Sequence, residues 1–450
     1  MLNTKTMETT LLRDLGDGLI LRRSTPADAD ALGDFNSRIH SDDGFENPFE
    51  PIAIWTRDLL RGNHPTFGTG DFTIVEDTRG GKIVSSLNLI SQTWSYAGIL
   101  FGVGRPELVG TLPEYRYRGL VRAQFEVVHR WSAERGEIVQ AITGIPWYYR
   151  QFGYEMTVHL GGGRLGYVPH VPKLKEGEAE PYRVRPASEA DLPFMMDVYA
   201  QAVRRYLLAC ARDAALWLYE LSGKDAQNVN GRKFAVIESA QGEPVGFLAH
   251  QGWLWGPTFP ITLYELKPGV SWAAVTPSVI RYAQATGEAY AARDKKEPFG
   301  AFGFWLGSDH PAYHAVADRL PRLRDPYAWY LRVPDLPGFL RLVRPVLEKR
   351  LSESVVVGYG GELKISFYRT GIRLVLDNGR LTTIEAWKPK RGDDGVAAFP
   401  DLTFLQLLFG YRTLQELRYA FADCWVEHDD ARAVLEAMFP KQNSDVWPVA

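Results

Sequence analysis

The chain repeats part of its own pattern after about 165 residues. Residues 21–28 (LRRSTPAD) and 184–191 (VRPASEAD) align at an offset of 163. Each segment reads as a short apolar strand followed by the first turn of a helix, with an acidic residue inside that turn. The N-cap candidates are Thr25 or Ser24 in the first copy and Ser188 in the second.

The agreement continues further along both copies. Residues 83–103 and 245–264 are uncharged, aromatic-rich segments, and each reads as two strands around a turn. Each copy then reaches a proline followed by aromatic residues, at 146–149 and at 311–314, an offset of 165. Matches in the same order predict two tandem copies of one fold.

Two changes in composition divide the chain into three parts. Residues 161–163 are glycines, and residues 169–181 are rich in Pro, Lys, Glu and Gly, which is typical of a linker. A second break lies at residues 333–338 (VPDLPG). We therefore expect domains at 18–165, 182–333 and 339–450.

The last part is predicted to be an α+β domain of ordinary size. Residues 340–351 have helical spacing, and residues 377–379 (DNG) are a typical hairpin turn. The expected strands are 355–357, 363–368 and 372–376, and the expected later helices lie around 402–408 and 431–438.

Composition excludes several classes of protein. Hydrophobic residues make up 45% and charged residues 23%, as in a folded globular chain, and the net charge of −3 argues against binding nucleic acid by bulk positive charge. The N-terminus has no apolar signal segment, and the uncharged stretch 83–104 is too rich in Ser, Asn and Gln to cross a bilayer. Cys210 and Cys424 read as separate buried thiols. We expect a cytoplasmic protein with no membrane or nucleic-acid partner.

The segment with the clearest chemistry is 108–121 (LVGTLPEYRYRGLV). An apolar strand ends at Pro113, and a basic loop then leads into a helix. The free N–H groups and the dipole of a helix N-terminus favour an anion such as a phosphate. Gly119 allows close approach of the backbone, and Arg116 and Arg118 add positive charge.

Arg116-x-x-Gly119-x-Val121 resembles the pyrophosphate loop of GNAT acyltransferases, Q/R-x-x-G-x-G/A. Val121 departs from the usual Gly or Ala, and a larger residue there is similar to the Eis (enhanced intracellular survival) subfamily. The resemblance implies acetyl-CoA as the acyl donor. The residues that it assigns to the donor are Leu108, Val109, Thr111, Arg116, Arg118, Gly119, Leu120 and Val121.

Residues 147–154 (WYYRQFGY) are similar to the Y-x-x-F-G-F/Y segment of the same family. The resemblance assigns Tyr149 the role of protonating the departing thiolate. The alternative is aromatic packing at helical spacing, which is our reading of Phe152 and Tyr154. The implied chemistry is direct attack of an amine on a thioester, with a backbone N–H from residues 108–112 stabilising the oxyanion. This chemistry requires no metal.

The second copy lacks the Arg-x-x-Gly loop and carries His314 at the position of Tyr149. We interpret it as a degenerate copy in which His310 and His314 are structural or surface residues. The third part resembles the sterol carrier protein-like domain of Eis-type proteins. The predicted fold class is therefore mixed α+β and α/β: two tandem GNAT folds, the second degenerate, followed by a sterol carrier protein-like α+β domain.

The resemblance also implies that the C-terminal carboxylate, here that of Ala450, acts as the base. The apolar tail 446–449 (VWPV) is unusual for a disordered end, and the alternative is a tail that only packs for stability.

The amine acceptor is predicted to lie beside the loop 40–46. Asp42, Asp43 and Glu46 would attract a cationic amine, and the alternative is a solvated acidic loop. The resemblance suggests aminoglycosides, polyamines or lysine side chains as acceptors, and a homo-oligomer, specifically a hexamer.

Other classes of function remain open. The protein could be a non-catalytic sensor of acyl-CoA, or a carrier that uses an apolar cavity in the third domain. Mycothiol synthase-like and aminoacyl-transferring enzymes also contain tandem GNAT folds, but the sterol carrier-like segment speaks against them.

Overall fold

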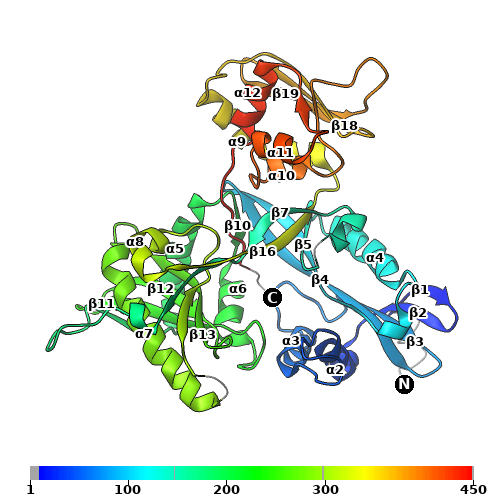
Figure 1. The fold of residues 1–450 in the computed structure, drawn as a ribbon. Coiled ribbons are helices and arrows are strands. Elements are labelled where there is room, and N and C mark those ends of the chain that lie inside the picture. Colours follow the sequence, from blue (N-terminus) through cyan, green and yellow to red (C-terminus); the bar gives the residue numbers. More distant parts are fainter. Residues whose placement is uncertain (1–9, 146, 296–297, 448–450) are drawn as a thin grey trace.

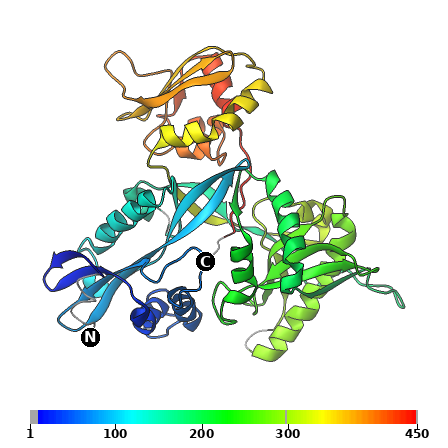
Figure 2. The same cartoon turned by 180° about the vertical axis from the view of Figure 1, so that it is seen from behind.

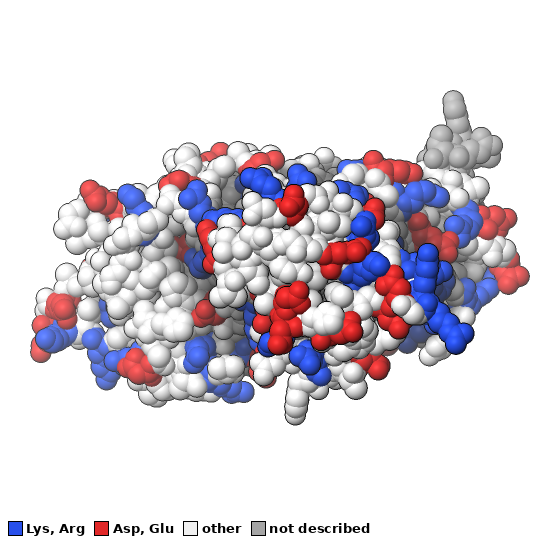
Figure 3. Space-filling view, turned by 90° about the horizontal axis from the view of Figure 1, so that it is seen from above, with Lys and Arg blue, Asp and Glu red and all other residues white. Residues whose placement is uncertain are grey.

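The computed structural model describes residues 10–145, 147–295 and 298–447. It contains three β-sheets, each with helices of its own, and the third sheet with its helices lies above the other two in Figure 1. No described helix is long and apolar enough to cross a bilayer. Seen from above (Figure 3), basic and acidic side chains are interspersed on the visible face.

The first sheet has nine strands. Their order is β1 (Leu11–Gly16), β2 (Leu19–Arg23), β3 (Phe72–Asp77), β4 (Lys82–Tyr96), β5 (Ile99–Thr111), β6 (Val139–Thr143), β16 (Tyr327–Arg332) and β7 (Glu155–Leu160), and β10 (Leu208–Ala211) pairs with β4. Its helices are α2 (Ala29–Ile39), α3 (Glu50–Leu60) and α4 (Leu120–Glu134). The predicted strand pair at 83–103 is confirmed, because β4 and β5 pair antiparallel around a turn at Ala97 and Gly98.

The second sheet has seven strands in the order β15 (Arg322–Arg324), β8 (Gly163–Tyr167), β14 (Ala301–Phe304), β13 (Thr258–Leu266), β12 (Pro244–His250), β11 (Lys233–Ser239) and β9 (Tyr182–Pro186). Its helices are α5 (Leu192–Ala202), α6 (Ala214–Leu218), α7 (Trp272–Asp294) and α8 (Pro311–Ala315). The order β9-β11-β12-β13-β14 repeats the order β2-β3-β4-β5-β6 of the first sheet.

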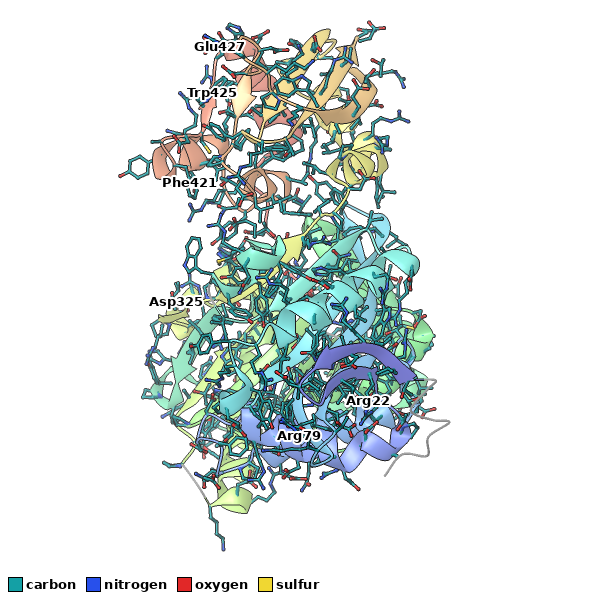
Figure 4. All side chains as sticks on the ribbon, turned by 90° about the vertical axis from the view of Figure 1, so that its right-hand side faces the viewer. Arg22, Arg79, Asp325, Phe421, Trp425 and Glu427 are labelled. Atoms are coloured by element: carbon teal, nitrogen blue, oxygen red, sulfur yellow. The ribbon has the colours of Figure 1, made fainter. Side chains whose placement is uncertain are left out.

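Matching ion pairs begin both copies, and those of the first copy are the more deeply buried. Arg22 donates to both carboxylate oxygens of Asp28 at 3.0 and 2.8 Å and to Glu76 at 2.6 Å. Arg185 makes the matching contacts with Asp191, at 2.9 and 2.7 Å, and with Glu238, at 2.6 Å. These ion pairs and the strand order confirm the internal repeat. In Figure 4, Arg22 lies at the end of the molecule away from the third sheet.

The expected helix starts are also confirmed. The short 3₁₀ helices η1 (Pro26–Asp28) and η5 (Glu189–Asp191) begin after Thr25 and Ser188. The backbone N–H of Thr25 donates to Asp28 at 2.7 Å, and that of Ser188 donates to Asp191 at 2.8 Å. The other 3₁₀ helices are η2 (Pro113–Tyr115), η3 (Tyr148–Phe152), η4 (Val168–His170), η6 (Val203–Arg205) and η8 (Ala317–Arg319), and η7 (Tyr219–Gly223) is a π-helical turn.

The first two sheets exchange strands. β16, from the second half of the chain, lies between β6 and β7 of the first sheet, and β8 pairs with β14 of the second sheet. The predicted ranges 18–165 and 182–333 therefore do not each hold a complete sheet, and β1 precedes residue 18. The sequence pattern of a strand indicates which face is apolar but not which sheet it joins.

The third sheet has the order β19 (Arg380–Trp387), β18 (Gly371–Asp377), β17 (Gly361–Ser366), β20 (Ala397–Ala398) and β21 (Trp425–Val426). Its helices are α9 (Leu336–Ser352), α10 (Phe404–Leu408), α11 (Leu414–Ala420) and α12 (Asp429–Met438). The hairpin turn is as predicted, with Asn378 and Gly379 in the left-handed region at φ 47° and 79°. The expected strand at 355–357 is wrong: the chain turns there, and the Val355 side chain is exposed.

The third domain packs directly on the first sheet and shares one hydrophobic core with it. The Tyr96 hydroxyl at the end of β4 donates to the Leu408 carbonyl at 2.9 Å, and Phe101 meets Phe339 edge to face at 5.5 Å. From α12 the described tail returns between the first two sheets (Figure 2), where Asp445 forms a bridge with Ala209 of β10.

Candidate active site

A cavity of about 850 Å³ opens where β5 and β6 separate. Among the described residues these parallel strands pair only at Val103–Val139 and Gly104–Gln140, although β5 continues to Thr111 and β6 to Thr143. Beyond those pairs, the edge of β5 that faces β6 has no strand partner. Its backbone groups are available to a ligand in the cavity.

A β-bulge lies on β5 inside this opening. Ser86 pairs with Gly110 and Asn88 with Glu107, so Leu108 and Val109 together oppose Leu87. Leu108 adopts φ 51°, which is unusual for a non-glycine residue. Bulges next to active sites redirect local backbone and side-chain groups. Here the bulge lies in the cavity wall.

The basic loop forms the next part of the wall. Gly119 has φ 76° and is the N-cap of α4, and the first hydrogen bond inside that helix runs from Ala123 N–H to the Gly119 carbonyl at 3.0 Å. The amides that precede Ala123 in the first turn have no partner within the helix. The cavity is lined by all eight residues predicted to hold the donor: Leu108, Val109, Thr111, Arg116, Arg118, Gly119, Leu120 and Val121. The set of residues fits an anionic ligand.

Tyr149 lies on η3 and also lines the cavity, with 5% of its surface exposed. Its ring packs edge to face against Phe125 and against Tyr330 of the exchanged strand β16. Gly144, at φ 147°, lies under the ring, and a Cβ there would be 2.7 Å from the ring carbon Cε2. Burial raises the pKa of the Tyr149 hydroxyl well above its ordinary value, and the Glu107 carboxylate adds to this. The hydroxyl therefore keeps its proton at neutral pH.

Two further residues that the sequence analysis did not select line the cavity, Glu107 and His40. The Glu107 carboxylate is 13% exposed, and it accepts hydrogen bonds from Arg105 at 2.6 Å and from the Thr143 hydroxyl at 3.1 Å. A charged residue inside the apolar strand next to the motif was the available signal for Glu107. His40 follows α2, and nothing local in the sequence connects it with this strand.

The predicted acceptor residues lie elsewhere. Asp42, Asp43 and Glu46 are exposed on the segment between α2 and α3 and are not among the residues that line the cavity. Their role in binding the acceptor stays a prediction. The structure also agrees with packing roles for the two later aromatic residues: Phe152 stacks on Phe125 at 4.4 Å, and the Tyr154 hydroxyl lies 2.8 Å from His129 Nε2.

Ala450 lies outside the described residues, but the tail that leads to it is described. The Val446 carbonyl accepts a hydrogen bond from Trp329 Nε1 at 3.3 Å, and Trp447 is buried. Trp329 on β16 pairs with Thr143, which lines the cavity. The described tail is therefore docked one strand away from the cavity.

In the corresponding part of the second copy, side chains form hydrogen bonds with the backbone. The Tyr313 hydroxyl accepts from Leu306 N–H at 3.0 Å and lies equally close to the Phe304 carbonyl. His310 is buried and accepts from the first turn of α8 at 3.2 Å, whereas His314 is exposed beside Asp309. These are structural and surface positions, as the sequence analysis expects.

Residues 37–157, which contain the basic loop and Tyr149, match the acetyltransferase (GNAT) domain family. This segment is therefore a GNAT-type acetyltransferase domain, a class that uses an acyl-CoA donor. No curated protein matches it by sequence. Among the described residues, no group of three or more His, Cys, Asp or Glu side chains could hold a metal ion.

The whole fold is similar to several solved structures. A probable N-acyltransferase from Enterococcus faecalis V583 has a TM-score of 0.65 at 15% identity, over 96% of this chain and 100% of its own. A GCN5-related N-acetyltransferase from Kribbella flavida has a TM-score of 0.64 at 16% identity, over 96% and 100%. Eis1 from Mycobacterium abscessus has a TM-score of 0.57 at 15% identity, over 95% and 98%. The three-sheet architecture is thus the Eis-like multidomain GNAT fold.

Proposed function

We propose that this protein transfers an acetyl group from acetyl-CoA to a primary amine by direct attack, with Tyr149 as the general acid. The observation that carries the proposal is that the eight donor-binding candidates and Tyr149 line one cavity, although they come from β5, the loop before α4, α4 itself and η3. The acceptor classes that the resemblance suggests are aminoglycosides, polyamines and lysine side chains.

Each part of the cavity has a separate task in this reaction. The first turn of α4, with Arg116 and Arg118, binds the phosphates of the donor. The free edge of β5 around the bulge supplies backbone N–H groups to the carbonyl oxygen, where negative charge develops. The Tyr149 hydroxyl, kept protonated by burial, gives its proton to the leaving thiolate.

The test is release of free thiol from acetyl-CoA in the presence of a panel of aminoglycosides, polyamines and lysine peptides. We expect release that depends on the amine, and the ranking of the panel defines the acceptor class. If acetyl-CoA binds but no amine promotes release, the protein is a sensor. If acetyl-CoA does not bind, the assignment of Arg116 and Gly119 is wrong.

The carrier alternative has less support. The apolar side chains of the third domain pack with the first sheet into one core. A cavity of about 620 Å³ in that domain is lined largely by charged residues, including Glu362, Lys364, Asp393, Asp394 and Glu427. Such a lining does not favour an apolar ligand. Glu427 and Trp425, which both line this cavity, lie in the third domain at the top of Figure 4.

The C-terminal carboxylate can be tested directly. Three residues follow Trp447, and they span at most about 10 Å when extended. If the Ala450 carboxylate is the base, adding one glycine after it displaces the charge by about 3.5 Å. We then expect kcat to fall by about 10²-fold or more.

The control for the added glycine is Ala450→Gly, which keeps the chain length and the terminal carboxylate. We expect it to retain activity in the same thiol-release assay. Equal activity of the extended and natural chains would mean that the tail serves packing only. The hexamer also stays a prediction, which light scattering on the purified protein would check.

A further inference from the structure

The close contact of α2 with the bulged strand places His40 at the cavity. This residue follows directly after α2, and its N–H donates to the Asn36 carbonyl at 3.0 Å. Gly110 makes the contact possible, because a Cβ there would lie 2.6 Å from Ile39 Cγ2. The buried Asn36 side chain accepts from Ser86 of β4 at 3.1 Å, which fixes the helix on the sheet.

The ring of His40 has an unsatisfied nitrogen. Nε2 is buried and has no hydrogen-bond partner among the described residues, although the residue lines the cavity. A buried polar atom without a partner is costly and rare in folded proteins, so a partner from the bound substrate is the simplest explanation. With the ring proton on Nδ1, Nε2 presents a lone pair to that substrate.

The charge state of the ring suits proton acceptance. Burial lowers the pKa of the His40 imidazole below its ordinary value, while the Glu107 carboxylate and the Leu108 backbone act in the opposite direction. The imidazole is therefore neutral at pH 7 and able to accept a proton. The carboxylate of Glu107 comes from β5 and the Tyr149 hydroxyl from η3. The other titratable groups that line the cavity are Tyr115, Arg116, Tyr117, Arg118, Arg122 and Tyr148.

We propose that His40, and not the Ala450 carboxylate, accepts the proton that the acceptor ammonium must lose, and that Glu107 holds the cationic acceptor beside it. This inference rests on the proposed acetyltransferase function. It identifies the acceptor as an ammonium-bearing compound that lies between the end of α2 and β5. The carboxylate of Glu107 is held for this task by Arg105 and Thr143.

The proton balance of the reaction is complete. Nε2 of His40 takes one proton from the ammonium and passes it to solvent. The free amine attacks the thioester carbon, the C–N bond forms and the C–S bond breaks, and the thiolate takes the Tyr149 proton. Attack by the neutral amine leaves one extra proton on the nitrogen. The tyrosinate, a strong base because burial raises the pKa of the Tyr149 hydroxyl, takes this proton and leaves the neutral amide. The net products are the acetylated amine, free thiol and one proton.

The experiment compares the natural full-length protein with His40→Gln in amine-dependent thiol release between about pH 5.5 and pH 9.5, a range that spans the ordinary pKa values of imidazole and thiol. We expect kcat/KM for the amine to fall by about 10²-fold or more at pH 7. The loss should shrink as the pH approaches the pKa of the acceptor amine, because free amine then needs no base. In the natural enzyme, activity should fall only below the ordinary imidazole pKa of about 6.5.

Two additional measurements separate a base from a structural residue. Imidazole added to His40→Ala should restore part of the lost rate, and KM for acetyl-CoA should stay within about twofold, since removal of a base does not alter uniform donor binding. His314→Gln, at the exposed histidine of the second copy, is the matched control and should behave as the natural protein.

A loss that is equal at every pH, or a pH profile identical to that of the natural protein, would overturn the role of His40. These outcomes leave the acetyltransferase proposal standing. Absence of amine-dependent release from the natural protein would instead remove the proposed function itself.

Discussion

Replacing Tyr149 by Phe is expected to lower kcat for amine-dependent thiol release by about 10²–10⁴-fold, the usual contribution of a general acid. The substitution removes only the hydroxyl. The ring contacts with Phe125, Tyr148 and Tyr330 can remain, so the shape of the cavity is retained. We expect no change in acetyl-CoA binding by calorimetry, because the donor site that we propose lies at the Arg116 loop.

The matched control is Tyr154→Phe. Tyr154 contacts the Tyr149 ring at 6.3 Å, and its own hydroxyl bonds to His129 rather than lining the cavity. Loss of this hydrogen bond should cost about 1 kcal/mol of stability and leave turnover unchanged. If Tyr149→Phe also turns over at the natural rate, then Tyr149 is a packing residue and the thiolate obtains its proton from solvent.

Replacing Trp329 by Ala is expected to destabilise the chain by about 3–5 kcal/mol, the range for removal of a buried Trp or Phe side chain. Trp329 is fully buried on the exchanged strand β16 and meets Trp94 edge to face at 5.4 Å. Its Nε1–H holds the tail through the Val446 carbonyl. One side chain therefore links the first sheet, the second half of the chain and the C-terminal tail.

The measurement is urea unfolding, monitored by tryptophan fluorescence and circular dichroism. The variants are compared by the urea concentration at the midpoint of the first transition, because a chain of three packed parts need not unfold in one step. Trp255→Ala is the control. Trp255 is 50% exposed, so its removal should change stability by less than about 1 kcal/mol. Equal destabilisation by both substitutions would mean that β16 does not hold the two halves together.

Local features of the sequence predicted much of the fold and of the candidate site. The repeat, the helix starts at Thr25 and Ser188, the β4–β5 pair and the hairpin at Asn378 all depend on residues close together in the chain. The donor-binding candidates were predictable for the same reason: the bulge, the loop with Gly119 and the start of α4 are consecutive. Tyr149 was found through a second local motif, and the end of β6 brings it to the same cavity.

The amino-acid sequence by itself determined the class of fold, the degenerate second copy and the set of residues proposed to bind the donor, because turn chemistry, capping and strand periodicity act over a few residues. Only the tertiary structure decided which sheet β16 joins, that Glu107 and His40 face the cavity, and that Asp42, Asp43 and Glu46 do not line it. Those outcomes depend on contacts between residues that are more than 60 positions apart in the sequence, such as Gly110 and Ile39. Such contacts form by burial of shape-matched side chains, and no short sequence motif encodes them.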